Sequence, residues 1–352
     1  MDSDSETPVD WEPDLLHHSG KKEKYNFRGE SIFITGGTGF FGRALLRNLK
    51  NLEKINFKVT VLSRSPKIFL DKYPEFDHHK WLNFIKGDIL NPESFPQRLK
   101  FTHIIHAATD STNGPLLSPI QRYNQIVEGT KNILEFAKIN HVKHFLLTSS
   151  GGVYGPQPEN MERIPETYCG MFDPLIPSNT YNVSKRTAEH LCSLYQDAYG
   201  IEVIIARCFS FVGEDLPLNV HYAIGNFILN ALTGKDIVIN GDGLALRSYL
   251  DQRDLAVWLL TILKKGSPGR AYNVGSEEPI SIGALAELVR DIISPKSKIH
   301  ILNNLSNRFI KNRYIPDTSR ARSEFDLSPP ISLSEAIRFT ALSIQRKISF
   351  IC

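Results

Sequence analysis

Short apolar runs alternate with segments of helical periodicity from Ser31 onward. Along the chain the runs read SIFIT, FKVTVLS, WLNFI, THIIHAA, HFLLTSS and IEVIIARCF. Between several of them apolar residues recur every three or four positions, which predicts helices at 40–52, 120–139 and 180–199. Short buried strands that alternate with helices form parallel sheets with right-handed crossovers. The pattern therefore predicts an α/β fold with a doubly wound parallel sheet.

The alternation loosens beyond Phe211, where turn signals rich in Gly, Asn and Pro become frequent. This change predicts a large α/β domain at 29–209, followed by a smaller C-terminal substrate-binding subdomain at 210–352. The run at 245–262 is expected to return to the larger domain. Residues 1–28 carry acidic and then basic side chains with little periodicity, which predicts a polar N-terminal arm.

Composition and charge exclude several classes of protein. The chain has 352 residues, 41% of them apolar, and a net charge of +3 with Lys and Arg scattered along it. We therefore expect a sizeable core and no nucleic-acid partner. No apolar run approaches the roughly 20 residues that a membrane span needs, and no signal-peptide pattern opens the chain, so we expect no membrane partner. The four cysteines have no short paired spacing, which indicates reduced thiols and a cytoplasmic location.

Two pairs of histidines have a spacing that metal ligands can have, but we expect no metal site. His103 and His106 are three residues apart, as are His141 and His144. Both pairs lie at segments that read as strands, and no set of carboxylates or cysteines accompanies them. Ordinary structural roles are therefore the preferred interpretation.

A glycine-rich stretch, TGGTGFFG at 35–42, joins the first expected strand to the first expected helix. Gly36 permits a sharp turn, Gly39 lets the backbone approach a pyrophosphate, and Gly42 lets the helix pack on the strand. An ordinary glycine turn is the alternative, but strand, spacing and helix together predict a Rossmann-type domain that binds NAD(P). The candidate cofactor contacts in this loop are Gly36, Thr38, Gly39, Phe40, Phe41 and Gly42.

The end of the second expected strand bears on which dinucleotide binds. An acidic residue there would hydrogen-bond the adenosine ribose and repel a 2′-phosphate. The chain reads VLSRSP at this point, so Ser63 cannot repel a phosphate and Arg64 offers a guanidinium that matches phosphate geometry. We therefore favour NADP as the cofactor, with NAD also possible. The alternative interpretation of Arg64 is that its side chain is only solvated.

Tyr181 and Lys185 in YNVSK are four residues apart on an expected helix, so both side chains project from one face. An ammonium near a phenol lowers the pKa of the phenol and makes it usable for proton transfer. Ser149 and Ser150 end an earlier strand at the carboxyl edge of the sheet, where open α/β folds bind ligands. Ser150 could hydrogen-bond the same substrate oxygen that Tyr181 protonates.

Taken together, these stretches resemble the extended short-chain dehydrogenase/reductases of the nucleotide-sugar epimerase/dehydratase family. The matching pieces are TGGTGFFG, GDI at 87–89, HAA at 106–108, EGTKNIL at 128–134, SSGGVYG, YNVSK and GDGLALRSYLDQRDLA at 241–256. They cover the chain from about residue 29 to the region of residue 339. The motifs are specific for the superfamily and say little about the substrate.

The resemblance implies roles for individual residues. Ser150, Tyr181 and Lys185 would be the catalytic residues, with Lys185 also holding the nicotinamide ribose. Asp88 and Ile89 would flank the adenine, and Ala107 would lie beside the cofactor. The family commonly forms a homodimer in which the helices expected at 120–139 and 180–199 build a four-helix bundle, and we expect the same here.

The resemblance also suggests residues for the substrate. Arg247 falls where an arginine of the family commonly binds the diphosphate of the sugar nucleotide. The alternative is that Arg247 is a surface arginine without a role in binding. Ser210 replaces an asparagine that often contacts the substrate. His221 and Asn226, in LPLNVHYAIGNFI, are further candidate contacts to the base or diphosphate.

Two glycines follow Ser150, the residue with the expected catalytic hydroxyl, and they reduce the number of reactions that we expect. In the family's 4,6-dehydratases an acidic pair stands at these positions, and its sugar-nucleotide decarboxylases carry a glutamate there. Gly151 and Gly152 cannot move protons, so dehydration and decarboxylation are disfavoured, although the glycines could serve only to turn the backbone.

The leading hypothesis is a 4-ketoreductase of a nucleotide-diphosphate deoxysugar, in which hydride transfer from the cofactor is combined with proton donation by Tyr181. A 4-epimerase would use the same residues and retain its cofactor. A non-catalytic NAD(P)-binding scaffold or sensor is the alternative from a different class. The intact set of Ser150, Tyr181 and Lys185 argues against it.

Overall fold

The computed structural model describes residues 25–52, 54–109, 116–218, 220, 222–302, 312–327 and 330–349. Residues 1–24 of the predicted N-terminal arm lie outside this part, as does the candidate residue His221. The last residues of the predicted arm contribute to the core, because Tyr25 and Phe27 are buried. Phe27 packs edge-on against His103, at the start of a central strand.

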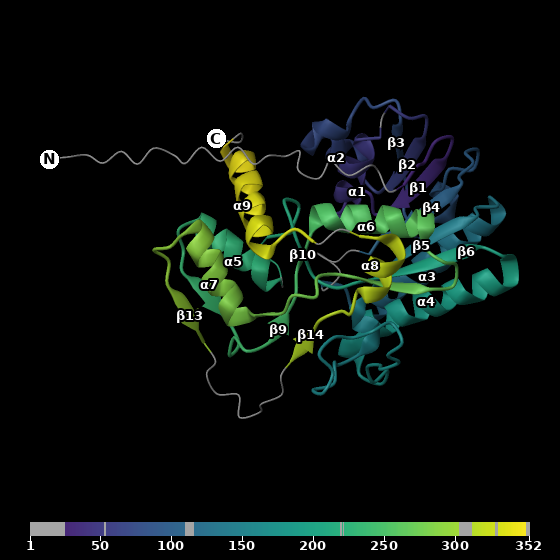
Figure 1. The fold of residues 1–352 in the computed structure, drawn as a ribbon. Coiled ribbons are helices and arrows are strands. Elements are labelled where there is room, and N and C mark those ends of the chain that lie inside the picture. The colour runs from purple at the N-terminus through teal and green to yellow at the C-terminus, as the bar shows by residue number, and fades with distance from the viewer. Residues whose placement is uncertain are drawn as a thin grey trace.

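A seven-stranded parallel sheet forms the centre of the larger part of the molecule (Figure 1). Its strands are β1 (Ser31–Thr35), β2 (Lys58–Ser63), β3 (Leu82–Lys86), β4 (His103–His106), β5 (His144–Ser150), β6 (Glu202–Cys208) and β11 (Ala271–Val274). They lie in the order β11-β6-β5-β4-β1-β2-β3, with β1 paired to β2 on one side and to β4 on the other. The strand order reverses between β1 and β4, where such sheets leave a crevice for ligands. The predicted α/β Rossmann-type fold is confirmed.

Helices cover both faces of this sheet. One face carries α1 (Phe40–Lys50), α2 (Pro66–Lys72), α6 (Gln252–Lys265) and α8 (Ser319–Phe325), and the other carries α3 (Pro119–Ile139) and α4 (Thr180–Tyr199). Strand β1 shows why both faces are apolar, since Ile32 and Ile34 join one core cluster and Phe33 joins the other. The helices predicted at 40–52, 120–139 and 180–199 are present within two residues as α1, α3 and α4.

A smaller unit lies beside the sheet, with α5 (Ala223–Leu232), α7 (Ile282–Ile293) and α9 (Leu333–Ser349) around their own apolar cluster (Figure 1). Its strands are short: β8 (Ile237–Ile239) pairs with β13 (Ile299–Ile301), and β9 (Leu246–Arg247) lies between β12 (Ile280–Ser281) and β14 (Arg313–Tyr314). β7 (Phe211–Val212) pairs with β10 (Leu250–Asp251). After β10 the chain returns to the large sheet, where α6 packs against α1 and β11 joins β6.

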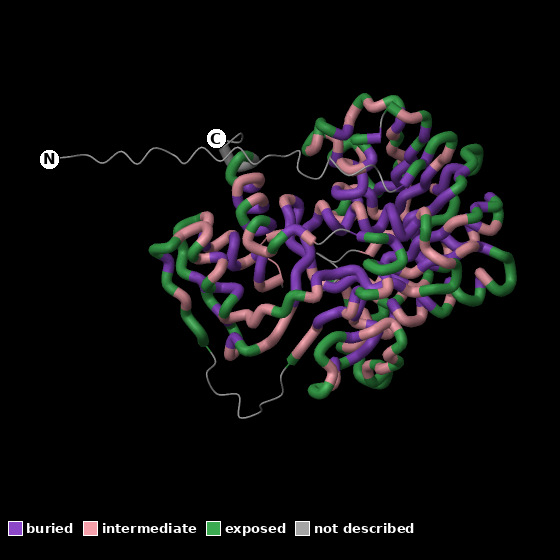
Figure 2. The backbone as a smooth tube through the Cα atoms, in the orientation of Figure 1, coloured by how far each residue is buried: buried purple, intermediate pink, exposed green. Residues whose placement is uncertain are grey.

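Short 3₁₀ helices occur in several loops. They span Pro74–Phe76, Pro92–Ser94, Gly151–Tyr154 (η4) and Pro177–Asn179. Figure 2 shows that buried residues follow the strands of the sheet, whereas exposed residues gather on the outer loops. No helix in the described part of the chain is long and apolar enough to cross a membrane.

The histidine pairs have structural surroundings. The ring nitrogens of His106 hydrogen-bond the hydroxyls of Thr35 and Thr130, and His103 stacks on His144 with ring centroids 4.6 Å apart. Among the residues that the structure describes, no three His, Cys, Asp or Glu side chains converge as metal ligands. Burial lowers the pKa of both His103 and His106 to about 3, so both rings are neutral near pH 7.

Candidate active site

The glycine-rich loop makes a sharp turn between β1 and α1. Gly36 has a φ of 75°, and a Cβ atom built on it would lie 2.4 Å from the carbonyl oxygen of Ala107. A Cβ on Gly42 would lie 2.3 Å from the backbone of Gly37. Gly39 caps α1 without a side-chain hydrogen bond, and no acidic residue follows in the first turn. The first amide groups of α1 therefore remain available to an anion, and the backbone approaches too closely for any larger residue at 36 or 42.

A cavity of about 840 Å³ runs from this loop past the carboxyl ends of β5 and β6 to β9. It brings together most of the predicted residues, namely Gly36, Thr38, Gly39, Phe40, Phe41, Arg64, Asp88, Ile89, Ala107, Ser150, Tyr181, Lys185, Ser210 and Arg247. Gly42 lies behind the loop. Asn226 does not line the cavity either, because its amide donates a hydrogen bond to the carbonyl oxygen of Val220 instead.

The residues around the first half of this cavity fit a dinucleotide. The volume lies within the usual range for ligand and cofactor pockets. A glycine cradle and a helix N-terminus stand at one edge, where a pyrophosphate would bind. Ser63 ends β2 in a buried position, and Arg64 follows as an exposed side chain on the cavity wall. The end of β2 therefore offers no carboxylate to a ribose.

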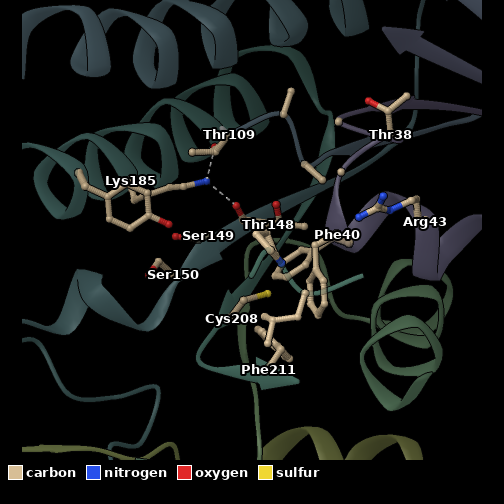
Figure 3. Close-up of a pocket in the computed structure, with 18 of the residues that line it drawn as sticks. Thr38, Phe40, Arg43, Thr109, Thr148, Ser149, Ser150, Lys185, Cys208 and Phe211 are labelled. Carbon is tan, nitrogen blue, oxygen red and sulfur yellow. Dashed lines mark hydrogen bonds between the residues drawn. The ribbon is translucent and has the colours of Figure 1, made fainter. Parts of the chain in front are cut away.

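Lys185 is held by two hydrogen bonds at the centre of the site (Figure 3). Its Nζ donates to Thr109 Oγ1 and to the carbonyl oxygen of Thr148, each at 2.8 Å. The side chain is buried, and this burial lowers the pKa of Lys185 to about 8. Thr109 was not predicted from the sequence, because it follows the HAA stretch without a motif of its own.

Tyr181 differs from the sequence prediction in the direction of its pKa shift. Burial raises the pKa of the phenol to about 12, and a hydrogen bond with Ser150 and the charge of Arg122 only partly oppose this. The cation over the ring is the guanidinium of Arg122 on α3, 4.7 Å from the ring centroid. Lys185 instead contacts Thr109 and Thr148. The prediction of a lowered pKa was wrong because desolvation of the phenol outweighs the nearby positive charge.

Ser150 is the last residue of β5, and its hydroxyl interacts with two tyrosines. Its Oγ accepts a hydrogen bond of 3.1 Å from the backbone N–H of Gly152. The Ser150 hydroxyl also lowers the pKa of Tyr181 on α4 and of Tyr314 on β14, and in both cases burial outweighs this effect and raises the pKa. The neighbouring hydroxyl of Ser149 has a different role, since it donates to the carboxylate of Glu189 behind the strand.

No side chain fits at the two glycines in the present packing. A Cβ atom on Gly151 would lie 2.7 Å from both the hydroxyl of Tyr314 and the ring of Phe209. A Cβ on Gly152 would lie 2.0 Å from the amide oxygen of Asn182. The hydroxyl of Tyr314 therefore lies where a side chain at position 151 would begin.

Arg247 and Tyr249 line the end of the cavity that lies away from the glycine-rich loop. The Nη1 atom of Arg247 donates to the carbonyl oxygens of Leu246 and Asn312, at 2.8 and 3.1 Å. Burial lowers the pKa of Arg247 and raises that of Tyr249 to about 12. Several residues of the site were not singled out from the sequence: Thr109, Arg122, Gln125, Cys208, Tyr222, Tyr249 and Tyr314.

Residues 32–275 match the model of the NAD dependent epimerase/dehydratase family. The chain belongs to this family. Among the curated proteins, UDP-glucuronic acid decarboxylase 1 of Arabidopsis thaliana is 30% identical over 87% of this chain and 68% of its own. The protein of the same name from Danio rerio is 28% identical over 90% of this chain and 73% of its own. The resemblance inferred from the motifs is thereby confirmed, and the chain is an enzyme of nucleotide-sugar metabolism of the extended short-chain dehydrogenase type.

Solved structures share the fold of this family member. A dTDP-glucose 4,6-dehydratase from Bacillus anthracis in complex with NAD superposes with a TM-score of 0.77 at 24% identity, covering 91% of this chain and 98% of its own. A UDP-glucose 4-epimerase from Thermotoga maritima gives a TM-score of 0.76 at 20% identity, covering 90% and 99%. Proteins with this fold thus catalyse different reactions, so the choice among them depends on the residues of the site.

Proposed function

We propose that this family member is a 4-ketoreductase of a nucleoside-diphosphate deoxysugar. One observation carries the proposal: Ser150, Tyr181 and Lys185 line one cavity, and Asp88, at the adenine end, is the single carboxylate among its described lining residues. Removal of water or of a carboxyl group by the family's acid–base route needs a carboxylate beside the catalytic hydroxyl. Proton donation to a carbonyl oxygen needs only the phenol and the hydroxyl.

The two glycines after Ser150 support this choice over decarboxylation. By family resemblance, decarboxylases carry a glutamate in this pair of positions. Here Tyr314 and Phe209 lie within 2.7 Å of the position that a Cβ on Gly151 would take. A side chain at position 151 would therefore require both rings to move, and a side chain at position 152 would require Asn182 to move. The function of the curated relatives is for this reason not transferred to this chain.

The protonation state of Tyr181 fits a reductase. Because burial raises the pKa of Tyr181 to about 12, the phenol holds its proton at neutral pH and can give it to a substrate oxygen. Ser150 would donate a hydrogen bond to the same oxygen, and Lys185, anchored on Thr109, would hold the cofactor ribose. A bound nicotinamide supplies the hydride for the neighbouring carbon.

The cofactor we propose is NADP, with NAD as the alternative. Ser63 and Arg64 at the end of β2 support a ribose 2′-phosphate, whereas solved relatives are described with NAD or NADH. Fluorescence titration should give a lower Kd for NADPH than for NADH. The Arg64→Ala variant should raise the Kd for NADPH by about 10-fold and leave the Kd for NADH unchanged. Tighter binding of NADH by the unaltered protein would contradict this choice.

A 4-epimerase is the second candidate, because the same three side chains could serve oxidation and reduction at one carbon. The purified protein should be incubated with NADPH and, in parallel, with the oxidised cofactor, in each case with a panel of nucleotide-linked 4-keto sugars and hexoses. Stoichiometric loss of NADPH absorbance with formation of a reduced sugar is the expected result. A new sugar without net loss of cofactor would identify an epimerase instead. Release of carbon dioxide from a nucleotide-linked uronic acid would contradict both.

We also propose that two copies associate through α3 and α4. Apolar side chains on these helices are exposed, among them Ile120, Ile139, Leu194 and Tyr199. Sedimentation should show a dimer, and Leu194→Arg should shift it toward monomers; a monomeric parent protein would refute the proposal.

We propose a cytoplasmic location because the described residues include three free cysteines, Cys169, Cys192 and Cys208.

A further inference from the structure

Two adjacent glycines follow Ser150 at the end of β5. The strand ends at Ser150, and η4 begins directly after it with Gly151 and Gly152. Glycine has more backbone freedom than any other residue, so this stretch by itself gives the serine hydroxyl little fixed direction. Tyr181 and Lys185 belong to a different element, α4. Contacts between α4 and the strand end must therefore set the position of Ser150 relative to these two side chains.

One such contact holds the strand just before Ser150. The hydroxyl of Ser149 donates a hydrogen bond of 2.6 Å to Oε1 of Glu189 on α4. The same carboxylate accepts from Nε and Nη2 of Arg207 on β6, at 3.0 and 2.7 Å. The side chain of Glu189 is 9% exposed and that of Arg207 is 17% exposed, so water has little access to the pair. Glu189 therefore ties two neighbouring strands to α4, one helical turn beyond Lys185.

A second contact holds the turn just after Ser150. Arg186 follows Lys185 on α4, and its Nη1 donates to the carbonyl oxygens of Val153 and Gly170, at 2.9 and 2.6 Å. Val153 belongs to η4 and is buried. Hydrogen bonds from a guanidinium are charge-assisted and stronger than those between neutral groups. Arg186 thereby fixes the far end of the two-glycine turn.

We propose that Arg186 and Glu189 are positioning residues that clamp the end of β5 and its two-glycine turn on α4. The clamp keeps the Ser150 hydroxyl in a constant position relative to Tyr181 and Lys185. Neither Arg186 nor Glu189 is among the described residues that line the cavity, so both act through the backbone on either side of Ser150. The catalytic consequence rests on the proposed function, whereas the effect on the turn can be measured without a substrate.

Ser149→Ala opens the first contact without breaking the buried ion pair. It removes the hydrogen bond to Glu189 and leaves the pairing of Glu189 with Arg207 in place. Truncation of Glu189 itself would leave a buried guanidinium without its partner, which strongly destabilises a fold. Ser149→Ala is therefore the variant that separates loss of the clamp from loss of the fold.

Arg186→Met opens the second contact, because it keeps a long side chain and removes the donor to Val153. Arg186→Lys is the conservative variant, since its ammonium remains a charged donor. Thr187→Val is the matched control on the same helix. The hydroxyl of Thr187 bonds the carbonyl oxygen of Val183 within α4, so its loss leaves both clamp contacts in place.

Hydrogen exchange of the full chain, followed by mass spectrometry of peptides that cover residues 151–155, measures the turn directly. The backbone N–H of Gly152 donates to Ser150 Oγ at 3.1 Å, so its exchange reports whether the turn stays closed. We expect exchange in these peptides to be about 10-fold faster in Ser149→Ala and in Arg186→Met than in the parent protein, because each variant loses a hydrogen bond that holds the turn.

The other variants test whether this effect is local. Arg186→Lys should restore most of the protection, and Thr187→Val should exchange like the parent protein. Exchange in peptides from β1 should be the same in every variant, because the sheet does not depend on the clamp. Faster exchange in β1 as well as in the turn would mean general loss of stability and would overturn the inference.

Turnover measures the catalytic consequence. The clamp acts on the geometry of the reacting groups and not on binding, so Ser149→Ala and Arg186→Met should each lower kcat by about 10-fold with KM nearly unchanged. Unchanged exchange in both variants would overturn the inference, and so would a faster turn with an unaltered kcat. The exchange result stands even if no nucleotide sugar is turned over, so failure of the proposed function is told apart from failure of the clamp.

Discussion

The two ends of the active-site cavity are built in different ways. At the cofactor end, β1, the glycine loop and α1 follow one another within residues 31–50. At the other end, where we propose that the sugar nucleotide binds, the two-residue strands β9, β12 and β14 meet from three separate parts of the chain. The first end is fixed by backbone contacts that only glycine permits, whereas side chains such as Arg247 and Tyr314 define the second. If the sugar nucleotide binds as we propose, side-chain changes at the second end would alter substrate preference while the first end keeps its shape.

The largest effect is expected where the two ends meet. Tyr181→Phe removes the proton donor and should lower kcat by about 10³-fold. Cofactor affinity should not change, because the ring and Lys185 remain. Steady-state turnover and fluorescence titration of the cofactor measure the two quantities. Tyr195→Phe, on the same helix but bonded to Glu135, is the control and should retain full activity. Equal activity of Tyr181→Phe and the parent protein would show that the phenol is not the acid.

The next effect concerns stability and comes from Lys185 at the cofactor end. Burial lowers the pKa of Lys185 from 10.5 to about 8 in the folded state. Below pH 8 both states hold the proton, and the folded state bears the cost of a buried charge. Between pH 8 and about 10.5 the unfolded chain binds more protons, so the free energy of unfolding rises with pH. For this residue the rise should reach about 3 kcal/mol.

Denaturant unfolding of the cofactor-free protein and of Lys185→Met across this pH range measures the effect. The stability difference between parent and variant should shift in favour of the parent as pH rises. Lys50→Met, at an exposed lysine of α1, corrects for the loss of a lysine elsewhere. A difference that does not vary with pH would mean that Lys185 is not desolvated in solution.

Gly36→Ala tests the claim that backbone contacts fix the cofactor end. The new methyl group would meet the Ala107 carbonyl oxygen at 2.4 Å in a backbone with a φ of 75°, so the loop must move. Cofactor affinity should fall by about 100-fold. Gly200→Ala is matched in φ, at 70°, but has nothing within 4 Å of the added Cβ. It should lower the free energy of unfolding by about 1 kcal/mol and leave cofactor binding intact. Similar Kd values of the two variants for the cofactor would show that the close approach of Gly36 to Ala107 does not determine cofactor binding.

The same contrast explains what could be predicted from the sequence. The sheet, the helices α1, α3 and α4 and the glycine loop depend on local periodicity and on turns that few residues can form. Ser150, Tyr181 and Lys185 could be named because each sits in a short motif at the edge of a predictable element.

Residues placed by long-range packing could not be predicted. Tyr314 carries no motif, and its position depends on the pairing of β14 with β9. Arg122 lies on a helix that was predicted, but nothing in the pattern indicated that its guanidinium would cover the ring of Tyr181. The predicted direction of the Tyr181 pKa shift was wrong for the same reason. Desolvation depends on side chains from several elements, whereas sequence spacing shows only the neighbours on one helix.

The smallest effect is expected at the substrate end, from Arg247→Lys. Two backbone carbonyl oxygens hold Nη1 of Arg247, which leaves the rest of the guanidinium for a diphosphate. A lysine cannot hold these carbonyls and bind a diphosphate in two-point fashion at once, so KM for the sugar nucleotide should rise by about 10-fold. Because this contact would be the same in the ground and transition states, kcat should stay nearly constant, as should cofactor affinity. Arg290→Lys, at an arginine of α7 paired with Asp291, is the control. An unchanged KM would place the diphosphate elsewhere in the cavity, and a lower kcat at constant KM would mean that Arg247 acts on the reacting sugar and not on its nucleotide.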